Sequence, residues 1–182
     1  YRMGPTSLDQ WNPATQTQTA TLIDDLKNPT AVAISADGSL LAIAQQAAAT
    51  IVWNLSTGAQ QELAQDPGTT ALAFSPDGKL LAAGCPHKAN LSDVKVWDLA
   101  AGQVRYTLPQ NKWSVGDLAF SPDGTKLAVA GWYEYGNIHC DVIVWNVPRE
   151  ELVANLVGHR RSITTVEFSP DGQFIASGSW DN

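Results

Sequence analysis

Short apolar runs separated by turn residues recur along the whole chain. Ala71–Phe74 and Lys79–Ala83 flank one such turn, and a third run, Val142–Trp145, ends on a tryptophan. These runs are rich in β-branched and aromatic residues, which is typical of strands. No stretch between turns is long enough to be a helix, or apolar with the helical period of about 3.6 residues. The pattern therefore predicts an all-β protein.

Two motifs repeat in phase with these runs. The first is a Ser-Pro-Asp-Gly turn, or Ser-Ala-Asp-Gly in one unit, whose aspartates are Asp37, Asp77, Asp123 and Asp171. The second is a tryptophan followed by Asp or Asn, at Trp11, Trp53, Trp97 and Trp145. Ser, Pro and Gly in this order suit a type I turn. A more polar run, such as Gln103–Leu108, follows each tryptophan. Each unit is thus predicted to contain four strands.

The paired motifs resemble the WD-repeat (tryptophan-aspartate repeat) family, whose four-stranded antiparallel blades form a β-propeller. The last unit matches best, with Gly158-His159 and then Ser177-Gly-Ser-Trp-Asp181. The resemblance implies that His159, Ser177 and Asp181 form a structural hydrogen-bond network that ends on the tryptophan of a blade. The positions that match His159 in the earlier units are Asp25, Gln65 and Asn111. We expect the network to be incomplete there, so packing must hold those blades.

The repeats divide the chain into about four blade-equivalents. Full blades are predicted at 28–65, 66–110 and 111–156, and half blades at 1–26 and 157–182. We expect a segment of a larger propeller, because residue 182 falls in mid-blade. Two other arrangements stay open: two chains that pair the first strands of one with the last strands of the other, and a self-closed ring of four blades. Open blade edges favour self-association of the isolated chain.

The resemblance also implies where partners bind. In this family the loops from second to third strands, and those between blades, share one face that commonly carries binding. Two of these loops look lengthened, at 85–92 and 131–140, and aromatic residues of the kind that anchor interfaces lie in the second. The alternatives are a neutral insertion and, for Trp180 and Trp113, packing of the aromatic side chains on neighbouring loops. The candidate partner-binding residues are Trp132, Tyr133, Tyr135, Trp180, Trp113 and His87.

The two lengthened loops also contain cysteine and histidine side chains. Cys85, His87, His139 and Cys140 lie in the two lengthened loops, but their spacing matches no zinc motif, so we expect neither a metal site nor a Cys85–Cys140 disulfide. The repeated aspartates are expected to be turn formers and not acid–base catalysts. The sequence has no nucleophile elbow and no phosphate-binding loop, and we predict a protein that is not an enzyme and needs no cofactor.

Charge narrows the choice of partner. With 11 basic and 18 acidic residues the net charge is −7, which disfavours nucleic acid and anionic membranes. No apolar run approaches the roughly 18 residues of a membrane span. The two cysteines fit a reducing compartment, so we expect a cytoplasmic protein. The sequence predicts a protein-interaction scaffold. The alternatives are a catalytic or ligand-binding propeller that uses its central channel, and a purely structural module. The innermost strands favour the scaffold, because they offer mainly Ala, Val, Leu and Phe, with Asp117 and Glu167 as the exceptions. A catalytic channel would need several converging polar side chains.

Overall fold

The computed structural model describes residues 6–63, 68–86, 92–110, 114–132 and 141–181. Over these residues the chain forms strands β1 to β16 and no helix, which confirms the all-β prediction. The N-terminal hairpin consists of β1 (Thr6–Asn12) and β2 (Thr17–Leu26). The C-terminal hairpin consists of β15 (Ile163–Phe168) and β16 (Ile175–Ser179).

Three four-stranded antiparallel sheets lie between the two hairpins. Blade 1 is β3 (Pro29–Ile34), β4 (Leu40–Gln45), β5 (Thr50–Asn54) and β6 (Gln60–Leu63). Blade 2 is β7 (Ala71–Phe74), β8 (Leu80–Pro86), β9 (Ser92–Asp98) and β10 (Gln103–Gln110). Blade 3 is β11 (Ser114–Phe120), β12 (Lys126–Trp132), β13 (Val142–Asn146) and β14 (Glu151–Leu156).

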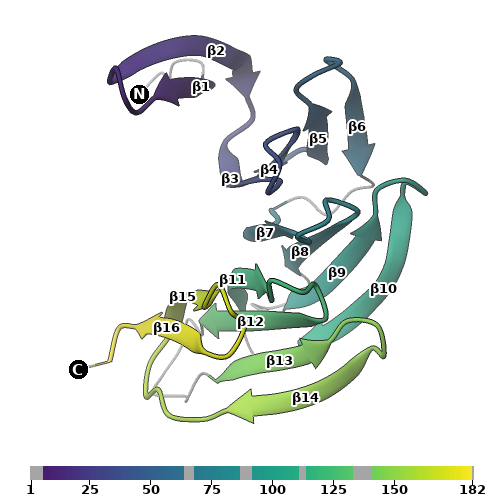
Figure 1. The fold of residues 1–182 in the computed structure, drawn as a ribbon, viewed down its shortest axis with the longest axis vertical. Helices are drawn as coiled ribbons and strands as arrows, with labels where there is room; N and C mark the ends of the chain where they lie inside the picture. The colour runs from purple at the N-terminus through teal and green to yellow at the C-terminus, as the bar shows by residue number, and fades with distance from the viewer. Residues whose placement is uncertain (1–5, 64–67, 87–91, 111–113, 133–140, 182) are drawn as a thin grey trace.

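The blades stand side by side in an arc that is open on the side where both ends of the chain lie (Figure 1). The first strands of the blades, β3, β7 and β11, together with β15, line its inner side, and consecutive members of this series contact one another. In the part of the chain that the structure describes, β1 pairs with β2 alone and β16 with β15 alone. The chain therefore does not close on itself as a ring of four blades.

Consecutive blades pack large side chains onto small ones. Ala42 and Ala44 on the second strand of blade 1 share a core cluster with Leu72 on the first strand of blade 2. At the next junction a Cβ atom on Gly84 would lie 2.6 Å from Cγ1 of Val115, so only glycine fits there. The first two strands of each blade thus present small residues to the blade that follows and large residues to the unit that precedes it.

The Ser-Pro-Asp-Gly turns join the first and second strands by a relay of hydrogen bonds. Ser75 Oγ donates to Asp77 Oδ1 (2.7 Å) and accepts from the backbone N–H of Leu80 (2.9 Å). The same carboxylate oxygen accepts from the Lys79 N–H (3.2 Å), and Gly78 takes a left-handed φ of 68°. The other turns repeat the serine–aspartate bond at 2.6 Å, in Ser35–Asp37, Ser121–Asp123 and Ser169–Asp171.

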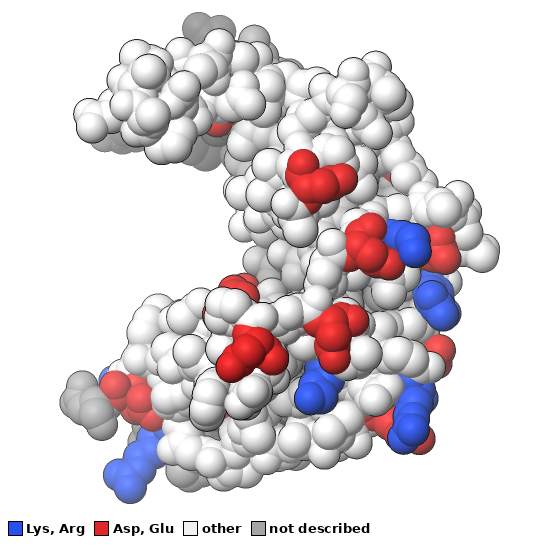
Figure 2. Space-filling model, in the orientation of Figure 1, with Lys and Arg blue, Asp and Glu red and all other residues white. Residues whose placement is uncertain are grey.

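These hydrogen bonds favour the ionised carboxylates. They lower the pKa of Asp37 and of Asp123 to about 2, and the bond from the serine hydroxyl is the largest cause in each turn. The pKa values of Asp77 and Asp171 are lowered for the same reason. Acidic side chains lie at intervals along the viewed face of the arc (Figure 2). The aspartates act as turn formers, since their oxygens are occupied by local donors.

A second turn follows each tryptophan of the repeat. Asn54 Oδ1 accepts from the backbone N–H groups of Ser56 and Thr57, both at 3.0 Å, and Gly58 completes the turn with φ of 73°. The matching positions in the N-terminal hairpin and in blade 3 are not glycine. Gln16 (φ 56°) and Glu150 (φ 57°) hold the same left-handed conformation with a side chain attached, which is strained.

We expect the substitution Glu150→Gly to stabilise the protein by about 1 kcal/mol, because it relieves the left-handed strain of an exposed residue. Urea denaturation measures the change. Gly58→Ala is the matched control: its Cβ would meet no atom within 4 Å, so backbone strain alone should destabilise it. A neutral result for both variants would contradict the strain.

Stability should also fall on acidification from pH about 4 to about 2. The folded pKa of Asp37 and of Asp123, about 2, lies below the ordinary aspartate pKa of 3.8. Each carboxylate therefore stabilises the fold above the higher value and loses this effect as pH falls through the lower one. Ser121→Ala should raise the pKa of Asp123 and flatten the pH dependence, as measured by carbon-13 NMR titration and by urea melts across this range. An unchanged Asp123 titration would rule out the serine bond as its cause.

Candidate functional site

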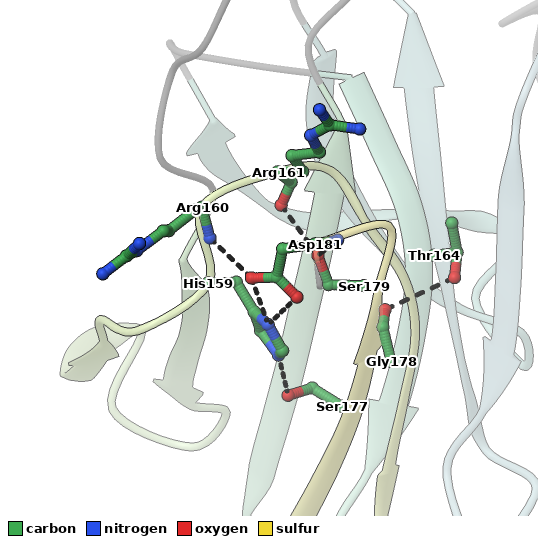
Figure 3. Close-up of polar contacts among 8 residues, drawn as sticks. All are labelled: His159, Arg160, Arg161, Thr164, Ser177, Gly178, Ser179 and Asp181. Carbon is green, nitrogen blue, oxygen red and sulfur yellow. Dashed lines mark hydrogen bonds and ion pairs between the residues drawn. The ribbon is translucent and has the colours of Figure 1, made fainter.

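The C-terminal hairpin brings together the three residues of the implied network (Figure 3). Nδ1 of His159 lies 3.1 Å from Oδ2 and 3.2 Å from Oδ1 of Asp181, and Nε2 lies 2.8 Å from Ser177 Oγ. A carboxylate can only accept, so the proton on Nδ1 is donated to Asp181. The pKa of Asp181 is lowered, first by the backbone N–H of Arg160 and then by His159.

This network ties the loop before β15 to the end of β16. The backbone N–H of Arg160 donates to Asp181 Oδ2 (2.7 Å), and Ser179 Oγ donates to the carbonyl of Arg161 (3.1 Å). Blade 1 fixes the corresponding loop with a different residue. There Gln45 Oε1 accepts from the Lys27 N–H (2.8 Å). Nothing in the repeat motif marks this glutamine, so sequence reasoning missed it.

The network has no counterpart of Ser177 in the full blades. Ser177 pairs with Val166, and the residues in the same register elsewhere are apolar and buried: Ile43, Ala83 and Val129. With no hydroxyl at this position, the buried indole N–H groups of Trp53 and Trp145 have no hydrogen-bond partner among the described residues. All three positions that match His159 lie outside the described side chains: they are Asp25, Gln65 and Asn111.

Both expected loops begin later than predicted, because Cys85 and Trp132, which we expected in them, are strand residues instead. Cys85 pairs with Asp93 and is buried, and Trp132 is the last residue of β12, where its backbone pairs with Ser114. The strands extend because neighbouring backbone groups continue the ladder beyond the repeat motif. The Trp132 side chain, and all of Tyr133, Tyr135, Trp113, His87, His139 and Cys140, lie outside the described residues.

Trp180 is the candidate partner-binding residue whose side chain the structure places. Its side chain is 70% exposed, and its backbone N–H donates to the Ser162 carbonyl (3.1 Å). Ser162 matches Ser114, since each directly precedes a buried residue of an inner strand. Trp180 and Trp132 therefore occupy equivalent positions in neighbouring units, each opposite a serine.

A mainly apolar hollow of about 300 Å³ lies beside Trp180, lined by Gly116, Ser162 and Thr164. Gly116 stands where the other inner strands carry Thr30, Thr70 and Thr164, and its missing side chain helps to open the hollow. Arg160 and Arg161 are exposed in the adjoining loop. The site can therefore offer an aromatic surface, an apolar recess and positive charge.

In the part of the chain described, no three His, Cys, Asp or Glu side chains are placed to hold a metal ion. These residues also contain no helix that could span a membrane.

The substitution His159→Ala should destabilise the protein by about 1–2 kcal/mol, because it leaves Ser177 and Asp181 without their side-chain partner and loosens the loop. Asn111→Ala is the matched control, at the corresponding position of blade 3. It should cost much less, since Val129 provides no hydroxyl there. Denaturant melts measure both, and equal losses would show that the network does not stabilise the hairpin.

Comparison with known proteins finds a matching family, a similar sequence and a similar structure. The family model described as WD domain, G-beta repeat matches residues 62–98, 102–146 and 150–182. WD repeat-containing protein 90 of Mus musculus is 32% identical over 91 residues, which cover 48% of this chain and 5% of the mouse protein. The solved structure of Kuenenia stuttgartiensis hydrazine synthase is 21% identical and superposes with a TM-score of 0.78 over 94% of this chain. The chain spans 49% of that structure's chain, and the likeness confirms the fold.

Proposed function

The chain belongs to the WD domain, G-beta repeat family, and we propose that it is a non-catalytic protein-interaction scaffold whose partner binds at Trp180. Repeats of this family generally act as protein-interaction scaffolds. The exposed indole of Trp180 beside an apolar hollow carries the proposal, because large aromatic side chains in such settings anchor interfaces.

The neighbouring unit extends the same surface. Trp132 takes the position of Trp180 one blade earlier, and Tyr133 and Tyr135, which follow it in the sequence, belong to the proposed surface. Trp113 and His87 belong to the proposed surface by their places in the sequence. Its partner is a protein or peptide that inserts an apolar side chain into the hollow. Exposed Arg160 and Arg161 favour an acidic residue beside that anchor.

The net charge of −7 supports a protein partner over nucleic acid or an anionic membrane. We propose a cytoplasmic location, because a chain with two cysteines fits a reducing compartment. The inner strands support a scaffold over a catalytic channel. Asp117, the acidic residue of β11, accepts the backbone N–H of Val166 (2.9 Å) and so joins two blades.

The double substitution Trp132→Ala and Trp180→Ala should abolish binding of the principal partner while leaving the melting curve unchanged. A hot-spot aromatic typically contributes about 2 kcal/mol or more to binding. The measurement compares wild type and variant in pulldowns from the native source, followed by titration of the recovered partner. Phe174→Ala is the matched control, since this residue is 69% exposed at the opposite end of the C-terminal hairpin. Equal retention by all three proteins would place binding elsewhere.

A further inference from the structure

The two ends of the arc are complementary halves of one blade. The C-terminal hairpin supplies first and second strands, and the N-terminal hairpin has the Trp-Asn motif of third and fourth strands. We propose that a second copy of this chain completes the blade. The β1 strand of one copy pairs with β16 of the other, and β3 of the first copy packs on β15 of the second.

Strand register in the three full blades fixes how β1 would pair with β16. In every blade the repeat tryptophan lies opposite the same position of the second strand, in the pairs Trp53–Leu41, Trp97–Leu81 and Trp145–Leu127. By this rule Trp11 lies opposite Ile175, and Gln10 lies opposite Ala176. Trp11 is 61% exposed, so its indole is available to cover the hairpin.

The uncovered faces fit the large-on-small rule of the other junctions. Val32 and Ile34 on β3 are 56% and 62% exposed, whereas Val166 and Phe168, in the same register of β15, are 1% and 7% exposed. Among the described residues, the unit that precedes β3 has only β1 and β2, and these two strands leave Val32 and Ile34 exposed. The face that lacks a following blade carries small residues: Ala176 and Gly178 on β16 match Ala42 and Ala44 of blade 1.

The outer strand of blade 3, β14, also has an apolar residue that lacks a covering neighbour. Leu63 and Leu108, each opposite the residue three before the repeat tryptophan, are both 2% exposed, and each belongs to a blade that is followed by a complete one. Leu156 has the same register but is 43% exposed, because the unit after blade 3 has only two strands. A hairpin added to β16 would cover Leu156. Gln10 replaces a buried valine of the full blades, and its Oε1 already accepts from Thr19 Oγ1 (3.0 Å).

A hydrogen bond between inner strands occurs at the first two blade junctions. Thr30 Oγ1 donates to the Thr69 carbonyl and Thr70 Oγ1 to the Val115 carbonyl, each at 2.6 Å. Thr164 has the same register on β15 and is exposed. Its Oγ1 lies 3.3 Å from the Gly178 carbonyl, as Thr70 Oγ1 lies 3.3 Å from the Gly84 carbonyl while making the shorter bond to the next blade. With β3 of a second copy packed on β15, the acceptor at the matching place is the carbonyl of Pro29. Strand register, side-chain size and this hydrogen bond thus point to one junction.

Two copies make this junction twice and close a ring. Each copy contributes three complete blades, and two composite blades join them, so the ring has eight, within the range of about four to eight blades known for propellers. Head-to-tail contacts close when the rotation per copy is a simple fraction of a turn. The arc is open between its ends, as Figure 2 shows, which leaves space for the second copy.

Size-exclusion chromatography with light scattering of the 182-residue chain tests the closure. We expect a two-copy species at micromolar concentration. The double substitution Val32→Thr and Ile34→Thr, which keeps β-branched strand residues, should shift it to monomer with unchanged circular dichroism. Val153→Thr is the matched control, because Val153 is 53% exposed and its counterpart Arg105 is exposed even in blade 2, which has blades on both sides. A wild-type monomer, or assemblies that grow beyond two copies, would overturn the proposal.

Disulfide trapping tests the register separately from stability. One chain carries Gln10→Cys and another carries Ala176→Cys, both in a background with Cys85→Ala and Cys140→Ser. Mixed under mild oxidation, they should form a mixed disulfide at least tenfold faster than Gln10→Cys with Phe174→Cys, which is two residues out of register. Equal rates for the two pairs would overturn the proposed pairing of β1 with β16.

Discussion

The packing of large side chains from one blade onto small side chains of the blade before it holds the structure together. A four-stranded sheet of this size cannot bury two faces by itself, so each blade depends on its neighbours. The close approach of Val115 to Gly84 shows how tightly this contact constrains the sequence. It also gives the arc a direction, because the two faces of a blade are different. Exposed Val32 and Ile34 at one end, and exposed Ala176 at the other, follow directly from that direction.

Turn hydrogen bonds then hold each blade in the shape that the packing requires. The serine–aspartate relay satisfies backbone groups at one end of the sheet, and the Asn or Asp after each tryptophan does so at another turn. The His159 network is a further device, found in the C-terminal unit. Where Ile43 or Val129 takes the place of this serine, the apolar side chain is buried, and the buried indole N–H of the same blade has no hydrogen-bond partner among the described residues. Blade-to-blade packing is strong enough to tolerate these unpaired donors, each of which costs about 1–3 kcal/mol.

The repeat made most of the fold predictable. Turn residues and β-branched runs in phase identify the strands because backbone conformation at Pro and Gly is locally determined. Trp132 and Cys85 were misplaced in loops because strand length beyond the motif depends on partners such as Ser114 and Asp93, which local sequence does not reveal. The hollow beside Trp180 was also missed, since it requires Gly116 from another blade. Local signals predict turns, whereas junctions between blades depend on residues far apart in sequence.

Completion of the C-terminal unit and the binding face are physically linked. Asp181 joins His159 and the backbone of Arg160, and Trp180 is held by the carbonyl of Ser162 in the same loop. Ser177, which bonds His159 on the other side, lies on β16, the edge strand that a second copy would cover. Pairing of β1 along β16 would restrict the strand that ends next to Trp180. The aromatic surface would then become more rigid without any new contact to it, and a preorganised surface loses less conformational entropy when a partner binds.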